Sequence, residues 1–324
     1  MNGITQTLVI GSRGSPLALW QSEWVKAQLE KHFRHLSVRV EIIKTTGDRI
    51  LDSPLSTIGD KGLFTKEIEH ALLDGAIDLA VHSLKDVPTA LPEGLTIGAI
   101  TKREDVRDVF VSHPQRSVKR FDDLPHGAAI ATGSLRRKCQ LMSWRPDLRI
   151  IDIRGNLNTR FAKLDASNWD GMILARAGVL RLGWEDRITE VLSLERILPA
   201  VGQGALAIEI RTKDTSVLKY LGILSHEPTT MSTCGERALL RRLEGGCQVP
   251  IGAYGRFEQN MFRLDGLIGS LDGKSVVRGA IETSPEDSEN AGTKLGETLL
   301  AAGGERILNA IRSSAAPTPT PLQP

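Results

Sequence analysis

One cysteine, Cys247, stands in a stretch whose composition suits a reactive loop. The stretch reads EGGCQVP and places two glycines before the thiol and a proline three residues after it. Paired glycines free the backbone for unusual conformations, and the proline ends regular hydrogen bonding. No Cys-x-x-Cys spacing supplies a disulfide or zinc partner. The pattern indicates a nucleophile or a covalent anchor, although a lone cysteine is more often a buried, unreactive one.

The segment HSLKDVP is the second group with chemical potential. It ends the apolar stretch 77–83, which predicts a buried parallel strand. Functional side chains of open α/β sheets gather where strands end, so Ser83, Lys85 and Asp86 become candidate site residues, with Asp86 as the acid–base carboxylate. Taken alone, the Lys–Asp pair is also compatible with a solvated ion pair. We interpret His82 as a core histidine rather than as a catalyst.

Arginines that follow predicted strands form the third group. Arg13 and Ser15 lie in a strand–turn–helix start, GSRGSP, whose backbone N–H groups would face an anion. ATGSLRRKCQL repeats this arrangement, with Ser134 as the helix cap and with Arg136 and Arg137 in the first helical turn. Cations there oppose the helix dipole, so a bound anion would explain them. For any single arginine, a solvated charged face is the simpler interpretation.

Two later segments carry more arginines of the same kind. IRGNLNTRF supplies Arg154 and Arg160, and ARAGVLRLGW supplies Arg176 and Arg181. A guanidinium group binds a carboxylate through charge-assisted contacts of ~1.5–3 kcal/mol. The whole set therefore predicts a cleft that holds a ligand with several carboxylates.

The elements that position these groups predict an α/β protein of three domains. A chain of 324 residues exceeds one typical core. Strand–helix units indicate a first lobe over 1–101 with 205–223 and a second lobe over 107–199, which form a hinged clamshell around the ligand. A small α+β third domain over 228–313 would carry the cysteine loop.

Two polar stretches carry no predicted strand or helix, one inside the first lobe and one at the end of the chain. The long stretch 45–62, closed by Lys61, is predicted to be a lid over the cleft. Residues 314–324 are rich in proline and threonine and are expected to form a disordered tail.

Composition narrows the class of protein. The net charge is +2 and aromatic residues make up 4% of the chain, which argues against a nucleic-acid surface. The odd number of cysteines (Cys139, Cys234 and Cys247) suits a reducing cytosol. We expect no secretory signal, no membrane helix and no metal site, and a monomer in the cytoplasm. Cys139 and Cys234 are interpreted as structural.

Together these segments resemble the porphobilinogen deaminase family. The matching stretches are GSRGSPLALWQ, TTGDRILDSPL, GDKGLFTKEIE, DLAVHSLKDVP, GSLRRKCQL, IRGNLNTR, PAVGQGALAIE and LEGGCQVPIG, which span residues 11 to 252. The resemblance implies two lobes like those of periplasmic binding proteins. It also implies a transferase that joins four porphobilinogen molecules head to tail, releases ammonia and makes hydroxymethylbilane for tetrapyrrole and heme biosynthesis.

The resemblance further implies a role for individual residues. Cys247 would hold a dipyrromethane cofactor through a thioether, Asp86 would be the catalytic residue, and Lys61 would belong to a mobile cover. The implied cofactor contacts are Ser83, Lys85, Thr132, Ser134, Arg136, Arg137, Arg154, Gly155 and Arg160. The implied substrate contacts are Arg13, Ser15, Gln21, Arg154, Arg160 and Arg181.

The chain departs from the family at two positions. Gly133 stands before Ser134 where the family commonly has two serines, and Thr57 stands where some members have a lysine. Two other hypotheses are a non-catalytic clamshell for a small anion and a nucleic-acid binder that uses the basic run 134–160. The first leaves EGGCQVP unexplained, and the near-neutral charge disfavours the second.

Overall fold

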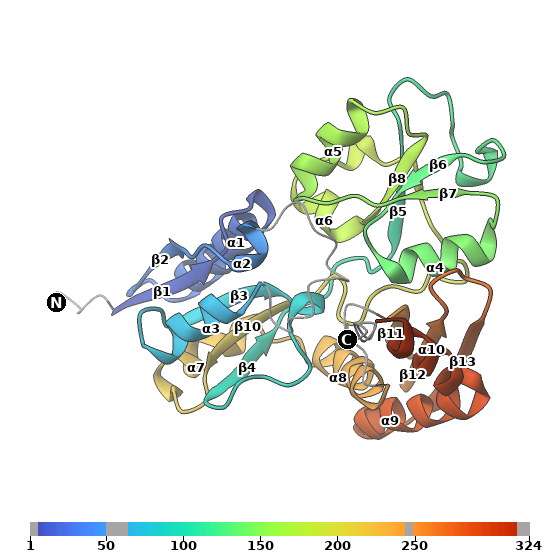
Figure 1. Cartoon of the computed structure of the whole chain (residues 1–324). Helices are drawn as coiled ribbons and strands as arrows, with labels where there is room; N and C mark the ends of the chain where they lie inside the picture. The colour runs from blue at the N-terminus through green and yellow to red at the C-terminus, as the bar shows by residue number, and fades with distance from the viewer. Residues whose placement is uncertain (1–5, 50–63, 244–248, 316–324) are drawn as a thin grey trace, which may run out of the picture.

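Three separate β-sheets organise the computed structural model, which describes residues 6–49, 64–243 and 249–315. Figure 1 shows them as three bodies. We call the sheet of β1 to β4 and β10, with its helices, lobe 1; the sheet of β5 to β9, with its helices, is lobe 2. The unit formed by α8 and everything after it is the C-terminal unit. The predicted class, α/β with a small α+β unit, is confirmed, while the residue boundaries of the domains stay a prediction.

Lobe 1 is a mixed sheet in the order β2-β1-β3-β10-β4, with β10 antiparallel to both of its neighbours. Its elements are β1 (Gln6–Ser12), α1 (Pro16–His32), β2 (Leu36–Ile42), α2 (Thr46–Arg49), α3 (Lys66–Leu73), β3 (Leu79–Ser83), β4 (Leu95–Ile100), β10 (Leu206–Arg211) and α7 (Thr215–Leu221). Helix α1 packs Val25 and Leu29 on one face of the sheet, and α3 packs Ile68 and Leu72 on another. Because β10 arrives from far along the chain, lobe 1 is built from two chain segments.

Lobe 2 repeats this plan in the order β7-β6-β8-β5-β9, with β5 antiparallel to β8 and β9. Its elements are β5 (Asp108–Ser112), β6 (Ala129–Ala131), α4 (Leu135–Trp144), β7 (Arg149–Ile151), α5 (Leu157–Asp165), β8 (Gly171–Ala175), α6 (Arg176–Arg181) and β9 (Glu190–Val191). Leu141 of α4 packs with Phe110, while Phe161 of α5 packs with Val109 and Val111. Neighbouring residues of β5 thus face opposite layers, as strand geometry requires.

The C-terminal unit is a three-stranded antiparallel sheet covered by helices. Its elements are α8 (Glu227–Arg242), β11 (Ile251–Glu258), β12 (Met261–Gly269), β13 (Val276–Thr283), α9 (Ser288–Leu299) and α10 (Glu305–Ala315). The predicted start of a disordered tail at residue 314 is wrong, because α10 continues to Ala315. Its apolar residues Ile307, Leu308 and Ile311 are buried, which explains the helix. The rest of the tail lies outside the described residues.

Short helical turns complete the described chain. They are the 3-10 segments Leu84–Asp86, Phe121–Asp123, Glu185–Arg187, Gly222–Leu224 and Pro285–Asp287 and the π-turn Leu300–Gly304. The first of them, η1 (Leu84–Asp86), follows β3 directly and carries two predicted site residues.

Two segments cross between the lobes. The first segment joins β4 to β5, and the return segment joins β9 to β10. Glu236 of α8 contacts both. Its carboxylate pairs with Arg103 in the first segment at 2.5 Å and accepts from the backbone N–H of Gly202 in the return segment at 2.7 Å. Arg103 also donates from Nε to the carbonyl of Gln203 at 2.7 Å, which ties the segments to each other. The C-terminal unit is thereby fixed to the junction of the lobes.

Candidate functional site

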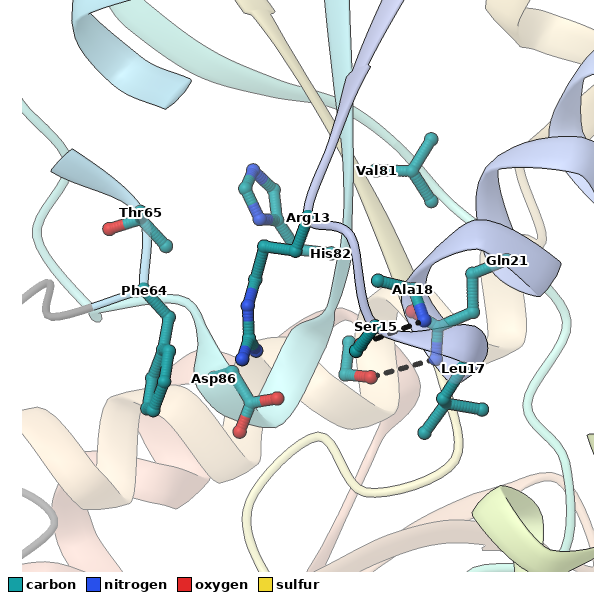
Figure 2. A pocket seen from close by; sticks show the side chains of 11 residues that line it. Arg13, Ser15, Leu17, Ala18, Gln21, Phe64, Thr65, Val81, His82 and Asp86 are labelled. Carbon is teal, nitrogen blue, oxygen red and sulfur yellow. Dashed lines mark hydrogen bonds between the residues drawn. The ribbon is translucent and has the colours of Figure 1, made fainter. Parts of the chain in front are cut away.

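A cavity of about 60 Å³ lies in lobe 1 where α1, β3 and η1 meet. Figure 2 shows its lining, with the guanidinium end of Arg13 next to Phe64 and Asp86. Sequence-predicted residues that line it are Arg13, Ser15, Gln21, Ser83 and Asp86. The structure therefore brings together predicted residues from two separate parts of the sequence, 13–21 and 83–86.

Local hydrogen bonds set the shape of this cavity. Ser15 caps α1 by accepting from the backbone N–H of Ala18 at 3.3 Å, and Pro16 occupies the first helical turn. Gln21 is buried and donates from Nε2 to the hydroxyl of Ser83 at 2.9 Å, a contact drawn in Figure 2. The guanidinium carbon of Arg13 lies 4.1 Å from the ring centroid of Phe64, within cation–π range. The helix start predicted at GSRGSP thus forms as expected.

Lys85 and Asp86 stand in η1, and both side chains reach solvent. Protein nevertheless surrounds Lys85 on its other sides, and this burial lowers the pKa of Lys85 to about 8. Asp86 opposes the shift, while Arg136 and Arg137 of lobe 2 add to it. Cations from the two lobes therefore act on one another across the space between them.

Arg136 and Arg137 are held on one buried carboxylate, Asp108. Arg136 donates from Nη1 to Oδ2 and Arg137 donates from Nη2 to Oδ1, both at 2.8 Å. Burial alone would raise the pKa of Asp108, but the two guanidinium groups hold it well below its ordinary value. Gln203 of the return segment donates to Oδ1 at 2.9 Å. The sequence alone does not point to Asp108, because nothing in it connects this residue with arginines 28 and 29 positions later.

Four arginines of lobe 2 keep a buried Nε donor that has no partner within the described ranges: Arg136, Arg137, Arg154 and Arg176. The first three are predicted cofactor contacts. An unpartnered buried donor costs roughly 1–3 kcal/mol, so these groups favour a ligand oxygen nearby. Their predicted roles as cofactor contacts stay predictions, and this observation supports them.

Arg160 and Gly155 share one turn. Gly155 has a φ of +108°, a conformation that side chains rarely adopt, and its carbonyl accepts from Nε of Arg160 at 2.9 Å. Burial, reinforced by Arg137 and Arg154, lowers the pKa of Arg160 to about 10, and Asp86 opposes the shift. Asp86 of lobe 1 thus lies within electrostatic reach of the arginines of lobe 2.

The turn before α4 explains why this chain has Gly133 where the family commonly has a serine. Thr132 accepts from the backbone N–H of Ser134 at 3.3 Å, and Ser134 accepts from that of Arg137 at 3.4 Å. A Cβ atom added at Gly133 would lie 2.5 Å from the carbonyl oxygen of Ile153. A serine at position 133 would therefore force the turn to shift.

Arg181 is positioned by the return segment. It donates from Nη2 to the carbonyl of Gly204 at 2.7 Å, and burial lowers its pKa to about 10. Its guanidinium carbon lies 5.9 Å from the ring centroid of Trp20, which belongs to lobe 1. Arg181 therefore touches the junction of the lobes, and its predicted contact with substrate is untested. Arg176 instead pairs with Asp105.

Cys247, Lys61 and Thr57 lie outside the described residues, so their predicted roles are untested. The two described cysteines are free. Burial raises the pKa of Cys139 to about 11, and it also raises the pKa of Cys234. Both thiols are therefore poor nucleophiles, in agreement with a structural role.

The described residues contain neither a candidate metal site nor a candidate membrane-spanning helix. No group of three or more His, Cys, Asp or Glu side chains in them could hold a metal ion. Within residues 6–49, 64–243 and 249–315, no helix combines the length and the apolar character that a membrane crossing requires.

Two family models match the chain. "Porphobilinogen deaminase, dipyromethane cofactor binding domain" matches residues 8–219, and "Porphobilinogen deaminase, C-terminal domain" matches residues 231–301. The first model covers both lobes and the second covers most of the C-terminal unit.

Curated relatives agree over almost the full length. The porphobilinogen deaminase of Chlorobaculum tepidum is 54% identical over 310 residues, which are 95% of this chain and 98% of that protein. The porphobilinogen deaminase of Chloroherpeton thalassium is 51% identical over 312 residues, with the same coverage of both chains.

Solved structures show a more distant likeness. The VFT2 domain of Bordetella pertussis BvgS has a TM-score of 0.42 and 14% identity, and the match covers 68% of this chain and 85% of that one. A probable amino-acid ABC transporter extracellular-binding protein, ytmK of Bacillus subtilis, has a TM-score of 0.40 and 12% identity, and the match covers 67% and 90% of the two chains. Likeness at this level supports no conclusion about activity.

Proposed function

Since this chain belongs to the porphobilinogen deaminase family, we propose that it joins four porphobilinogen molecules head to tail, with release of ammonia, to give hydroxymethylbilane. One observation carries the proposal beyond the family match. Asp86 reaches solvent at a cavity of lobe 1, within electrostatic reach of Lys85 and of arginines that come from lobe 2. A carboxylate among cations suits a substrate that brings carboxylates and develops positive charge at its ring.

The described residues fit a dipyrromethane cofactor. Its acidic side chains need cations, and the buried Nε donors of Arg136, Arg137 and Arg154 lack partners among the described residues. We propose that these arginines, Lys85 and Arg160 hold the cofactor, with Cys247 as its covalent attachment. Ser83, Thr132, Ser134 and Gly155 complete the set. When bound, the cofactor supplies the pyrrole ring to which the first substrate is joined.

The protein's own residues then have distinct tasks. Arg13, Ser15 and Gln21 line the cavity, and we propose that they orient the incoming substrate by its carboxylates together with Arg154, Arg160 and Arg181. Asp86 stabilises the cation that forms when the amine leaves and exchanges a proton with the reacting groups. Asp108 keeps Arg136 and Arg137 rigid, so their positive charge is present before the ligand arrives.

We further propose the finer assignments that sequence and composition favour. The domains follow residues 1–101 with 205–223, 107–199 and 228–313, and the stretch that ends at Lys61 acts as a lid. The protein works as a monomer in the cytoplasm, without nucleic acid or membrane as partners. Support comes from the near-neutral net charge and the odd number of cysteines. Light scattering on a size-exclusion column measures the oligomeric state.

Intact mass spectrometry of the purified protein tests the proposal. We expect a mass above that of the sequence by two linked pyrrole units, and we expect Cys247→Ser protein to show the bare sequence mass. Cys139→Ser protein is the matched control and should keep the extra mass, since Cys139 is buried. Incubation with porphobilinogen should yield hydroxymethylbilane and one ammonia for each ring joined.

A bare mass in preparations that bind anions but release no ammonia would favour the non-catalytic clamshell instead. That alternative explains the lobes and the arginines, but it leaves the family match over residues 231–301 without a role.

A further inference from the structure

Three titratable side chains are buried together behind the cavity of lobe 1. His82 of β3 is 7% exposed, Glu209 of β10 is 0% exposed and Glu69 of α3 is 5% exposed. Nε2 of His82 lies 3.0 Å from Oε2 of Glu209. Glu69 interacts electrostatically with both of them. The three side chains, here called the buried triad, come from three elements of one lobe.

The buried triad keeps two acceptors without partners in the described part of the chain. Burial and then the neighbouring Glu209 raise the pKa of Glu69. Oε1 of Glu69 and Oε1 of Glu209 have no hydrogen-bond partner among the described residues. An unmet buried acceptor is costly, so the cluster is not explained by packing alone.

His82 also forms part of the cavity wall, next to Arg13 and Asp86. Figure 2 shows its ring beside the side chain of Arg13. A carboxylate oxygen accepts hydrogen bonds, so the contact with Glu209 places the hydrogen of the neutral ring on Nε2. Nδ1 then carries a lone pair, and the hydrogen bond found for the ring within the described part of the chain uses Nε2 instead. A base oriented by a carboxylate is the arrangement that general-base catalysis requires.

The proposed reaction has a proton for such a base to accept. When two pyrrole rings are joined, a carbon–carbon bond forms, a ring C–H bond breaks, and its electron pair restores the aromatic ring. This proton must leave the ring in the same round in which Asp86 serves the departing amine and the cation that forms. Although the sequence alone favours a core histidine at this position, we propose that Nδ1 of His82, oriented by Glu209, accepts this ring proton and passes it to the departing ammonia or to water. This inference rests on the proposed function.

Charged groups of both signs lie around His82. Arg13 and Asp86 line the same cavity, Glu209 contacts Nε2 of the ring, and Glu69 interacts electrostatically with the ring. His70 of α3 also acts on Glu69, from the exposed face of that helix.

Histidine nitrogen NMR tests the orientation without any need for activity. Uniformly ¹⁵N-labelled protein at pH 8 should show His82 as the Nε2–H tautomer, with the resonance identified by its loss in His82→Gln protein. Glu209→Gln should remove the preference, because an amide can donate to the ring as well as accept from it. An Nδ1–H tautomer in the wild-type protein, or an unchanged tautomer in Glu209→Gln, would overturn the proposal.

Kinetics then test the proton transfer. His82→Gln keeps a donor for Glu209 but removes the base, so kcat should fall by about 10²–10⁴-fold while the bound cofactor mass is unchanged. Porphobilinogen that carries deuterium at its free ring carbon should show a larger isotope effect with His82→Gln than with the wild type. Full kcat and an unchanged isotope effect in both His82→Gln and His82→Asn would overturn the proposal. A wild-type protein that makes no hydroxymethylbilane would overturn the proposed function and leave the NMR result standing.

Discussion

Lobe 1 and lobe 2 start from the same local design and use it differently. In each, a strand leads through a tight turn into a helix that a serine caps: Ser15 for α1 and Ser134 for α4. The cations beside these two helix starts have opposite surroundings. Arg136 and Arg137 turn inward onto buried Asp108, whereas Arg13 lies over Phe64 at the cavity and Asp86 stays exposed.

This difference divides the work between the lobes. In lobe 2, positive charge is fixed by an internal carboxylate, so its position does not depend on a ligand. In lobe 1, the carboxylate that we propose as the catalytic group, Asp86, reaches solvent and can meet the substrate. Exposed groups contribute little to stability, whereas a buried charge cluster contributes a great deal when one partner is removed. The four predictions that follow test this division.

The largest expected effect is on turnover in lobe 1. Asp86→Asn should lower kcat by about 10²–10⁴-fold, because the carboxylate that stabilises positive charge and moves protons is lost. The free energy of unfolding should stay within ~0.5 kcal/mol of the wild type, because the side chain is exposed. Steady-state assays with porphobilinogen and thermal melts measure the two quantities.

Asp122→Asn, another exposed aspartate, is the matched control and should change neither quantity. Full turnover in Asp86→Asn would assign the chemistry of lobe 1 to other residues. A large loss of stability would show that Asp86 is as structural as Asp108.

In lobe 2 we expect a large loss of stability when the internal carboxylate is removed, in contrast to Asp86→Asn. Asp108→Asn leaves the guanidinium groups of Arg136 and Arg137 buried without their anion, so the free energy of unfolding should fall by about 3–5 kcal/mol. Asp165→Asn breaks an exposed pair with Arg187 and should cost at most about 1 kcal/mol. Urea titrations of the two variants make the comparison. If Asp108→Asn is as mild as Asp165→Asn, the arginines of lobe 2 are not held by Asp108.

The sequence predicted the elements of both lobes better than the contacts of their side chains. The continuous apolar run 77–83 predicted β3, because burial of both faces constrains the sequence of a strand. The short β9 left no such pattern, and the helix α10 was assigned in part to a disordered tail. Local sequence gives little signal for elements that depend on distant packing partners.

The candidate site was predictable in its members and not in its pairings. Arg136 and Arg137 were expected to face a ligand, and the structure shows their main partner to be Asp108, nearly 30 residues away. Gly133 was noticed as a departure, but its reason is the approach of the Ile153 carbonyl from the next strand connection. Long-range contacts of this kind depend on the fold, which a single segment does not encode.

The third prediction, with an effect of intermediate size, concerns how pH changes the proton uptake that accompanies anion binding beside Lys85. The pKa of Lys85 is lowered to about 8 from an ordinary value of 10.5. Between these values the unfolded chain binds more protons than the folded protein, so the Lys85 contribution to stability rises with pH over this window. An anion bound beside Lys85 reverses the shift, so binding at pH 8–9 should take up a proton.

Calorimetry of porphobilinogen binding in two buffers of different ionisation enthalpy measures this uptake. To isolate binding from turnover, the titration uses Asp86→Asn protein. Adding Lys85→Arg should abolish the uptake and keep the affinity, whereas adding Lys85→Met should abolish both. Uptake that persists in either double variant would place the titrating group elsewhere.

The smallest expected effect compares the two serine caps directly. Ser15→Ala and Ser134→Ala each remove a hydroxyl that accepts from a backbone N–H, at 3.3 and 3.4 Å respectively. Each should cost about 1 kcal/mol of stability, with a Tm lower by roughly 2–4 °C. Only Ser15 lines the cavity of lobe 1, so Ser15→Ala should also raise the KM for porphobilinogen. Replacement by glycine, which caps helices almost as well, should restore most of the stability in both lobes and leave that KM high. A rise in KM for Ser134→Ala with none for Ser15→Ala would reverse the division, because it would place the contact with incoming substrate in lobe 2.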